Sequence, residues 1–221
     1  MGSLLNRKYL FIHINKSAGG VVTNNMSANG DTKITGYHRP LKKCLSIAEG
    51  LGVDVSKLYI FTAVRNPWDR MLSMYLFYKS NQCLSPEFYS GDPVVDGSFT
   101  DWIKYIYSDG FDRQLRHSDV NIFNYCFSNQ LNWLKDDSGR ILQVDKILRH
   151  EEMSEKLKPF LRDILKLKTI NLSRVHPTKH THYSDYYDTE SKMLVAKHYQ
   201  EDLDYFKYKF SNQKYKTLKA C

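Results

Sequence analysis

The sequence has no closely spaced pair of cysteines. Its four cysteines (Cys44, Cys83, Cys126 and Cys221) lie far apart, which argues against a zinc ribbon or a dense disulfide framework and favours reduced thiols. No apolar run approaches the roughly 20 residues that a membrane-spanning helix needs, and the N-terminus becomes charged too early for a signal peptide. Asn6 stands where an N-myristoylation signal needs Ser or Thr. We therefore expect a cytoplasmic protein if the sequence is full length; a fragment cut from a membrane-anchored protein has the same features.

A Walker P-loop is also missing, because in G-x-x-x-x-G-K-[ST] the lysine follows the glycines. In residues 9–20, YLFIHINKSAGG, Lys16 instead precedes Gly19 and Gly20. The apolar run predicts a buried strand that breaks into a tight turn and opens a helix. Glycine lets backbone N–H groups approach an anion, the helix N-terminus adds partial positive charge, and the lysine adds a full one. This combination indicates a phosphate or sulfate cradle; the alternative is an ordinary strand-turn-helix corner with a surface lysine.

The composition is that of a soluble globular protein. The 221 residues suit one domain over 1–221, with 42% hydrophobic and 25% charged residues. The net charge of +8 favours polyanionic partners such as nucleotides, nucleic acid or acidic glycans.

Strand-like and helical patterns alternate along the chain, which predicts a single α/β domain with a central, mostly parallel sheet flanked by helices. We expect Asn66 to cap a helix that starts at Pro67, and Pro159 to interrupt or bend another. The expected strands are 9–12, 58–64 and 140–144, and the expected helices are 20–28, 40–49, 67–78, 99–107, 151–166 and 188–206.

A second anion-binding feature follows the apolar run LYIFTAV. Arg65 leaves the carboxyl end of this predicted buried strand, the edge at which open α/β sheets bind ligands. Its planar guanidinium suits bidentate contact with a phosphate, and Ser73, two turns into the next helix, can add a hydrogen bond. The alternatives are an ion pair of Arg65 with Asp69 or another acid, and a plain hydroxyl at Ser73.

HINKSAGG followed by VRNPWDRMLSMY resembles the two cofactor motifs of sulfotransferases that use 3′-phosphoadenosine 5′-phosphosulfate (PAPS). The variant is similar to the carbohydrate O-sulfotransferase branch, with its HIPKTGGTS and VRNPYDRLVSAY-like patterns. DDSGRILQVDKILRHEEM and the C-terminal YYDTESKMLVAKHYQEDLDYFKYKF also resemble segments of that branch. The resemblance covers most of the chain and implies a P-loop, nucleotide-kinase-like sulfotransferase fold.

The resemblance also implies roles for single residues. Binding of the 5′-phosphosulfate falls to Lys16, Ser17, Ala18, Gly19 and Gly20, with Lys16 stabilising the leaving phosphate; the 3′-phosphate falls to Arg65 and Ser73. The sequence departs from the family at Asn15, where proline is usual, and at Gly20-Val21, where hydroxyl residues are usual. A hydroxyl contact to the 5′-phosphate must then come from Ser17, or from Thr23 if the turn shifts.

His38, in TGYHRPLKK, matches the place where relatives carry a histidine between the two cofactor motifs. Because an unperturbed neutral imidazole accepts a proton near physiological pH, we expect His38 to be the general base; the alternative is a surface or capping histidine. His13 matches the motif histidine and is expected to be structural. His176, His180 and His182 form no credible metal set, and no metal is expected.

The predicted reaction moves the sulfuryl group of PAPS to a hydroxyl, in preference to an amine, of a glycan or small-molecule acceptor, with 3′-phosphoadenosine 5′-phosphate (PAP) as product. Arg174 and Lys179 suggest a basic loop over the nucleotide, and Gln130 is a candidate to face the acceptor. The loops 82–98 and 109–121, with nearby aromatics such as Phe99 and Trp102, carry no decodable acceptor pattern. No nucleic acid partner is expected, and a fragment of an anchored enzyme would belong in the Golgi lumen. The rival functions are a nucleotide-dependent kinase of related fold and a non-catalytic polyanion-binding protein.

Overall fold

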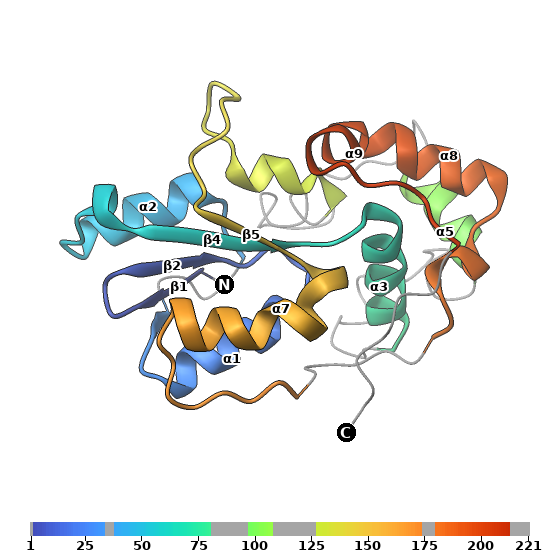
Figure 1. Ribbon diagram of the computed structural model, residues 1–221. Coiled ribbons are helices and arrows are strands. Elements are labelled where there is room, and N and C mark those ends of the chain that lie inside the picture. The colour runs from blue at the N-terminus through green and yellow to red at the C-terminus, as the bar shows by residue number, and fades with distance from the viewer. Residues whose placement is uncertain (1, 34–37, 81–96, 108–126, 174–179, 213–221) are drawn as a thin grey trace. The chain divides into compact units, whose positions relative to one another are not determined.

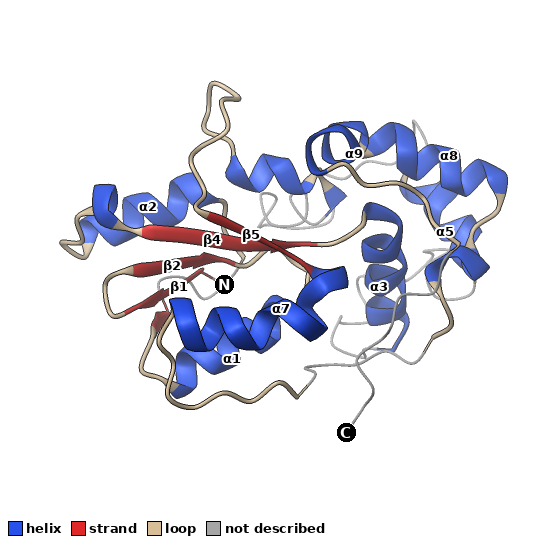
Figure 2. Cartoon of the chain, in the orientation of Figure 1, coloured by secondary structure: helices blue, strands red, loops and turns tan. Residues whose placement is uncertain are grey.

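The computed structural model describes residues 2–33, 38–80, 97–107, 127–173 and 180–212. Backbone contacts divide the chain into two compact units. The first comprises Met1–Arg65, Gln130–His176 and Leu218–Cys221, and the second Asn66–Asn129 and Pro177–Thr217. The described strands all belong to the first unit, and the second is helical where it is described (Figure 2). The predicted α/β class is confirmed, whereas the assignment of residues 1–221 to one domain stays a prediction.

The first unit is built on a five-stranded sheet in the order β3-β1-β2-β4-β5 (Figure 1). The central strand β2 pairs in parallel with β4, which pairs in parallel with β5, and β1 is antiparallel to both of its neighbours. β3 thus runs in the same direction as β2, β4 and β5, so four of the five strands point the same way and the sheet is mostly parallel, as predicted. Its strands are β1 (Gly2–Leu5), β2 (Tyr9–Ile12), β3 (Thr32–Lys33), β4 (Tyr59–Val64) and β5 (Lys146–Arg149).

The sequence patterns misplaced one strand and missed two others, β1 and β3. β1 forms a hairpin with β2 through Asn6 and Arg7, both with positive φ (52° and 53°). The strand predicted at 140–144 is wrong, because Asp136 there accepts hydrogen bonds from the backbone N–H groups of Ser138 and Arg140 and closes a turn. Pairing with β4 begins only at Lys146, which lies opposite Phe61.

Helices cover both faces of this sheet (Figure 1). Side chains alternate along β2, so Phe11 packs in one cluster with α1 (Gly19–Ala28) and α7 (Met153–Pro159), and Leu10 packs in another with α2 (Leu41–Gly50). Pro159 ends α7 and a π-helical segment, Phe160–Ile164, follows it, which confirms that the helix predicted at 151–166 is interrupted near Pro159. Further short 3-10 turns are Val55–Lys57, Gln130–Leu134 and His150–Glu152.

The second unit contains α3 (Pro67–Ser80), α5 (Phe99–Ile106), the 3-10 turn Tyr183–Tyr186, α8 (Thr189–His198) and α9 (Gln200–Phe206). The predicted cap of α3 is confirmed, since Asn66 Oδ1 accepts a hydrogen bond from Trp68 N at 3.1 Å. The helix predicted at 188–206 is interrupted at Tyr199, which is fully buried and whose hydroxyl donates to Phe127 O at 2.9 Å.

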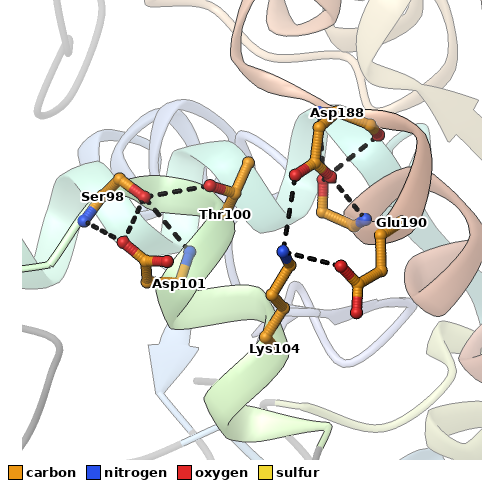
Figure 3. A network of polar contacts seen from close by, with 7 residues as sticks. Ser98, Thr100, Asp101, Lys104, Asp188 and Glu190 are labelled. Carbon is orange, nitrogen blue, oxygen red and sulfur yellow. Dashed lines mark hydrogen bonds and ion pairs between the residues drawn. The ribbon is translucent and has the colours of Figure 1, made fainter.

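Exposed polar contacts join two helices of this unit (Figure 3). Ser98 and Asp101 form a capping box at the start of α5. Lys104 of α5 reaches Glu190 at 2.7 Å and Asp188 at 3.6 Å at the start of α8. Such exposed pairs contribute little stability each, so the buried aromatic cluster around Trp102 holds the unit together. Every helix in the described part of the chain is too short or too polar to span a bilayer.

Candidate functional site

The loop between β2 and α1 has an alternating backbone, which is the pattern typical of an anion-binding nest. Lys16 and Ala18 have positive φ (61° and 60°), and Ser17 between them does not. Alternation of this kind turns successive N–H groups toward one point. A non-glycine residue in the left-handed conformation costs about 1–2 kcal/mol, so the backbone of this loop is strained at Lys16 and Ala18. Strain that the fold maintains in this way is typical of ligand-binding backbone.

The start of α1 adds to this nest. Ala18 at the N-cap makes no side-chain hydrogen bond, and the first turn contains no acidic residue. The first backbone N–H groups of a helix have no partner within the helix, and the helix dipole makes this end partly positive. The N-terminal end of α1 therefore suits an anion that accepts hydrogen bonds from the backbone, as the sequence predicts for Gly19 and Gly20.

Two cationic side chains lie at the loop. Arg65 follows β4, is 8% exposed, and donates from Nη1 to the Lys16 carbonyl oxygen at 3.3 Å. Burial, and secondly the charge of Arg65, lower the pKa of Lys16 from 10.5 to about 8. An anion bound between Lys16 and Arg65 would stabilise the charged ammonium and so counteract the lowering of the Lys16 pKa by burial and by Arg65. The structure thus brings together Lys16, Ser17, Ala18 and Arg65, as the sequence analysis expected.

Gln130 is a site residue that the sequence analysis misread. It is fully buried, and its side-chain amide bonds to Ser17 and to the backbone of Arg65. The expectation that Gln130 faces an acceptor is therefore wrong. Nothing in the local sequence signals the contact, because Gln130 is 113 residues from Ser17 and 65 from Arg65.

His38 is oriented by a backbone carbonyl next to the cradle. Its Nδ1 lies 2.8 Å from the carbonyl oxygen of His13. Because a carbonyl only accepts, Nδ1 carries the proton in the neutral ring and Nε2 carries the lone pair. The His13 ring lies edge-on to His38 with centroids 4.4 Å apart, and Trp133 flanks His38 at 6.1 Å. This tautomer suits a general base that acts through Nε2.

His13 is buried against the first residue of α1. Burial, and secondly the charge of His38, hold the pKa of His13 well below its usual range, so the ring is neutral. A Cβ atom at Gly19 would overlap Cδ2 and Nε2 of His13. The expected structural role of His13 is thus to pack directly on the glycine that opens α1.

This contact leads to a prediction for Gly19→Ala. The added methyl group must displace a buried ring that also packs on Phe11 and His38, so we expect a loss of about 1–3 kcal/mol in the free energy of unfolding. Urea titration measures this loss. Gly50→Ala in α2 is the matched control, because a Cβ atom there meets nothing within 4 Å. Equal stability of the two variants would contradict the packing.

The remaining candidates divide into four groups. Ser73 is 5% exposed on α3 in the second unit, so its role at the cradle stays a prediction. The Thr23 hydroxyl donates to the carbonyl oxygens of Gly19 and Gly20 at 3.1 Å and serves α1 itself. Phe99 and Trp102 lie in the core of the second unit. Arg174, His176, Lys179 and almost all of the loops 82–98 and 109–121 lie outside the described residues.

Comparison with known proteins gives one family. A family model described as Sulfotransferase family matches residues 6–209, a range that includes the cradle, His38, Arg65, Ser73 and Gln130. Comparison with curated proteins and with solved structures gives no match.

Proposed function

The chain belongs to the sulfotransferase family, and from this premise we propose that it transfers the sulfuryl group of PAPS to a hydroxyl of a carbohydrate or small-molecule acceptor. An amine is the second choice of acceptor. One observation carries the proposal: the strained, lysine-bearing loop at the uncapped start of α1, with the Arg65 guanidinium at its backbone. The carbohydrate acceptor rests on the resemblance to the carbohydrate O-sulfotransferase branch.

The cradle fits an anionic cofactor. Its donors are backbone N–H groups at a helix N-terminus, and its charges are those of Lys16 and Arg65; burial of Lys16, and secondly the charge of Arg65, lower the pKa of Lys16. We assign the 5′-phosphosulfate to residues 16–20 and the 3′-phosphate to Arg65, and the resemblance adds Ser73. Ser17 Oγ donates to Gln130, so we expect Ser17 to contact the anion through its backbone N–H group.

Two side chains carry the proposed chemistry. When bound, PAPS supplies the sulfuryl group and leaves as PAP. His38 keeps its own proton on Nδ1, bonded to the His13 carbonyl oxygen, and takes the acceptor's hydroxyl proton at Nε2. Lys16 contributes positive charge beside the leaving phosphate. Because Lys16 is half-buried, its attraction to that phosphate is stronger than it would be in water.

The cofactor assignment is tested by calorimetric titration with PAP and, separately, with ATP and magnesium. We expect the wild type to bind PAP selectively, and Arg65→Ala to weaken PAP binding about 10–100-fold, since hydrogen bonds to charged groups contribute about 1.5–3 kcal/mol. Arg65→Lys, which keeps the charge and loses the planar fork, should fall between them.

Arg7→Ala is the matched control for this experiment. Arg7 lies in the hairpin turn at the opposite end of β2 and donates to the carbonyl oxygens of Leu51 and Gly52, so its loss removes an equal charge far from the cradle. An equal loss of PAP affinity in Arg7→Ala would mean that net charge alone drives binding. Wild-type protein that binds ATP with magnesium as tightly as PAP would favour the kinase function instead.

A further inference from the structure

One buried side chain links the two halves of the cradle. Gln130 Oε1 accepts hydrogen bonds from Arg65 N at 2.9 Å and Ser17 Oγ at 3.2 Å, and Gln130 Nε2 donates to Arg65 O at 2.8 Å. The glutamine is fully buried, as is Ser17. These contacts connect three stretches of the first unit: the β2–α1 loop, the end of β4, and the 3-10 turn Gln130–Leu134.

The bonds to Arg65 satisfy backbone groups that the sheet leaves behind. Strand β4 ends at Val64, so Arg65 lies beyond the last strand residue, where its N–H and C=O groups are buried. Buried backbone groups need partners, and one side-chain amide supplies both. Gln130 therefore holds the main chain of Arg65 in place, and this fixes the point from which the Arg65 side chain extends.

The same amide also holds the anion loop. Ser17 lies between Lys16 and Ala18, the two residues with positive φ. Its hydroxyl bonds to the oxygen atom that also receives Arg65 N–H. This oxygen atom, together with the bond from Arg65 Nη1 to the Lys16 carbonyl oxygen, therefore helps to fix the spacing between the loop assigned to the 5′ end of the cofactor and the arginine assigned to the 3′-phosphate.

We propose that Gln130 is a positioning residue that sets this spacing and thereby gives the protein its preference for a nucleotide with phosphates at both the 3′ and the 5′ position of the ribose. The inference rests on the proposed function. Two contacts on one ligand reinforce each other only when the protein holds them at the span of that ligand. Loss of Gln130 removes three of the hydrogen bonds that hold the loop and Arg65 at this spacing, so a ligand that bridges them loses more affinity than one that binds the loop alone.

The test compares PAP with 5′-AMP, which lacks the 3′-phosphate, in calorimetric titrations of the wild type and Gln130→Met. Methionine has similar length and cannot form the three hydrogen bonds. We expect PAP affinity to fall about tenfold and 5′-AMP affinity to fall less than about threefold, by the usual contribution of such bonds. Thr62→Val is the matched control: it loses a fully buried hydrogen bond to Ile12 O in the same sheet and should leave the ratio unchanged.

A second measurement reads the link without ligand. Arg65 N–H should exchange with deuterium much faster in Gln130→Met than in the wild type, while amides inside β4 keep their protection. If Gln130→Met does not fold, Ser17→Ala takes its place; it removes only one of the three bonds, and we expect the PAP to 5′-AMP ratio to fall about threefold.

The outcomes separate the two proposals. Equal loss of both nucleotides, or an unchanged ratio, overturns the positioning role and leaves Gln130 as a purely structural residue, while the cofactor assignment stands. Wild-type protein that binds neither nucleotide overturns the proposed function and, with it, this role of Gln130.

Discussion

His38→Asn is expected to lower kcat about 10²–10⁴-fold, the usual contribution of a positioned general base, and to leave PAP affinity within about twofold. Asparagine places an amide N–H where Nδ1 lies, so the donor to the His13 carbonyl oxygen is kept while the basic Nε2 is removed. The substitution thus separates the base from the structural contact, which alanine would not do. Steady-state rates with PAPS and an accepted hydroxyl compound, beside calorimetry with PAP, measure the two effects.

His198→Gln is the matched control for the base. His198 Nε2 lies 3.2 Å from the Phe127 carbonyl oxygen, and glutamine keeps that donor in the second unit. We expect its kcat to stay within about twofold of the wild type, in the range of substitutions that preserve their contacts. If His38→Asn retains a tenth or more of the wild-type kcat, another group takes the proton and His38 is a packing residue.

Sequence patterns predicted those parts of the fold and site that depend on neighbouring residues. The apolar run before Lys16, the strand before Arg65 and the cap at Asn66 are local features, and the structure has each where it was expected. The strand predicted at 140–144 failed for a reason that lies in one side chain. The apolar spacing of that segment suits a strand, but Asp136 closes a turn instead.

The finer geometry of the site depends on contacts between distant residues. The tautomer of His38 is set by a carbonyl group 25 residues away, and the link through Gln130 spans 65 and 113 residues. The positive φ of Lys16 and Ala18 was not predicted either, since neither residue type favours it. A sequence therefore indicates which side chains can bind an anion, while their spacing emerges only from the packed sheet.

Lys16→Met is expected to lower kcat/KM about 10²–10³-fold, because positive charge at the leaving group is among the largest contributions to group transfer. Methionine keeps the length and the unbranched Cβ of lysine, so the left-handed conformation at φ 61° carries no additional strain. Lys57→Met is the matched control: it removes the same charge from an exposed pair with Asp54 and should leave kcat/KM unchanged. Turnover with PAPS distinguishes the two variants.

The same substitution should make the ligand-free protein more stable. In the folded state the pKa of Lys16 is about 8, and in the unfolded state it returns to 10.5, so the unfolded chain binds more protons between these values. Stability should therefore rise with pH from about 8 to 10.5 in the wild type. At pH 7 we expect the free energy of unfolding of Lys16→Met to exceed that of the wild type by about 1–2 kcal/mol. Converting the whole pKa shift of Lys16 at ~1.4 kcal/mol per unit gives a larger value, which is reduced here because the side chain is partly exposed to solvent.

Binding of PAP should reverse this proton balance. An anion favours the charged ammonium and raises the pKa of Lys16, so wild-type affinity should be level below about pH 8 and fall up to tenfold per unit above it. Calorimetry at pH 8.5 in two buffers of different ionisation enthalpy should show proton uptake in the wild type and none in Lys16→Met.

For Lys16→Met, a gain in stability without any loss of turnover would mean that Lys16 is a strained surface lysine and that the charge acting on the leaving group comes from elsewhere. Loss of both stability and turnover would mean that Lys16 supports the loop itself. Only the opposite signs of the two effects, lower activity with higher stability, identify a residue held at a cost to the fold for the anion that it binds.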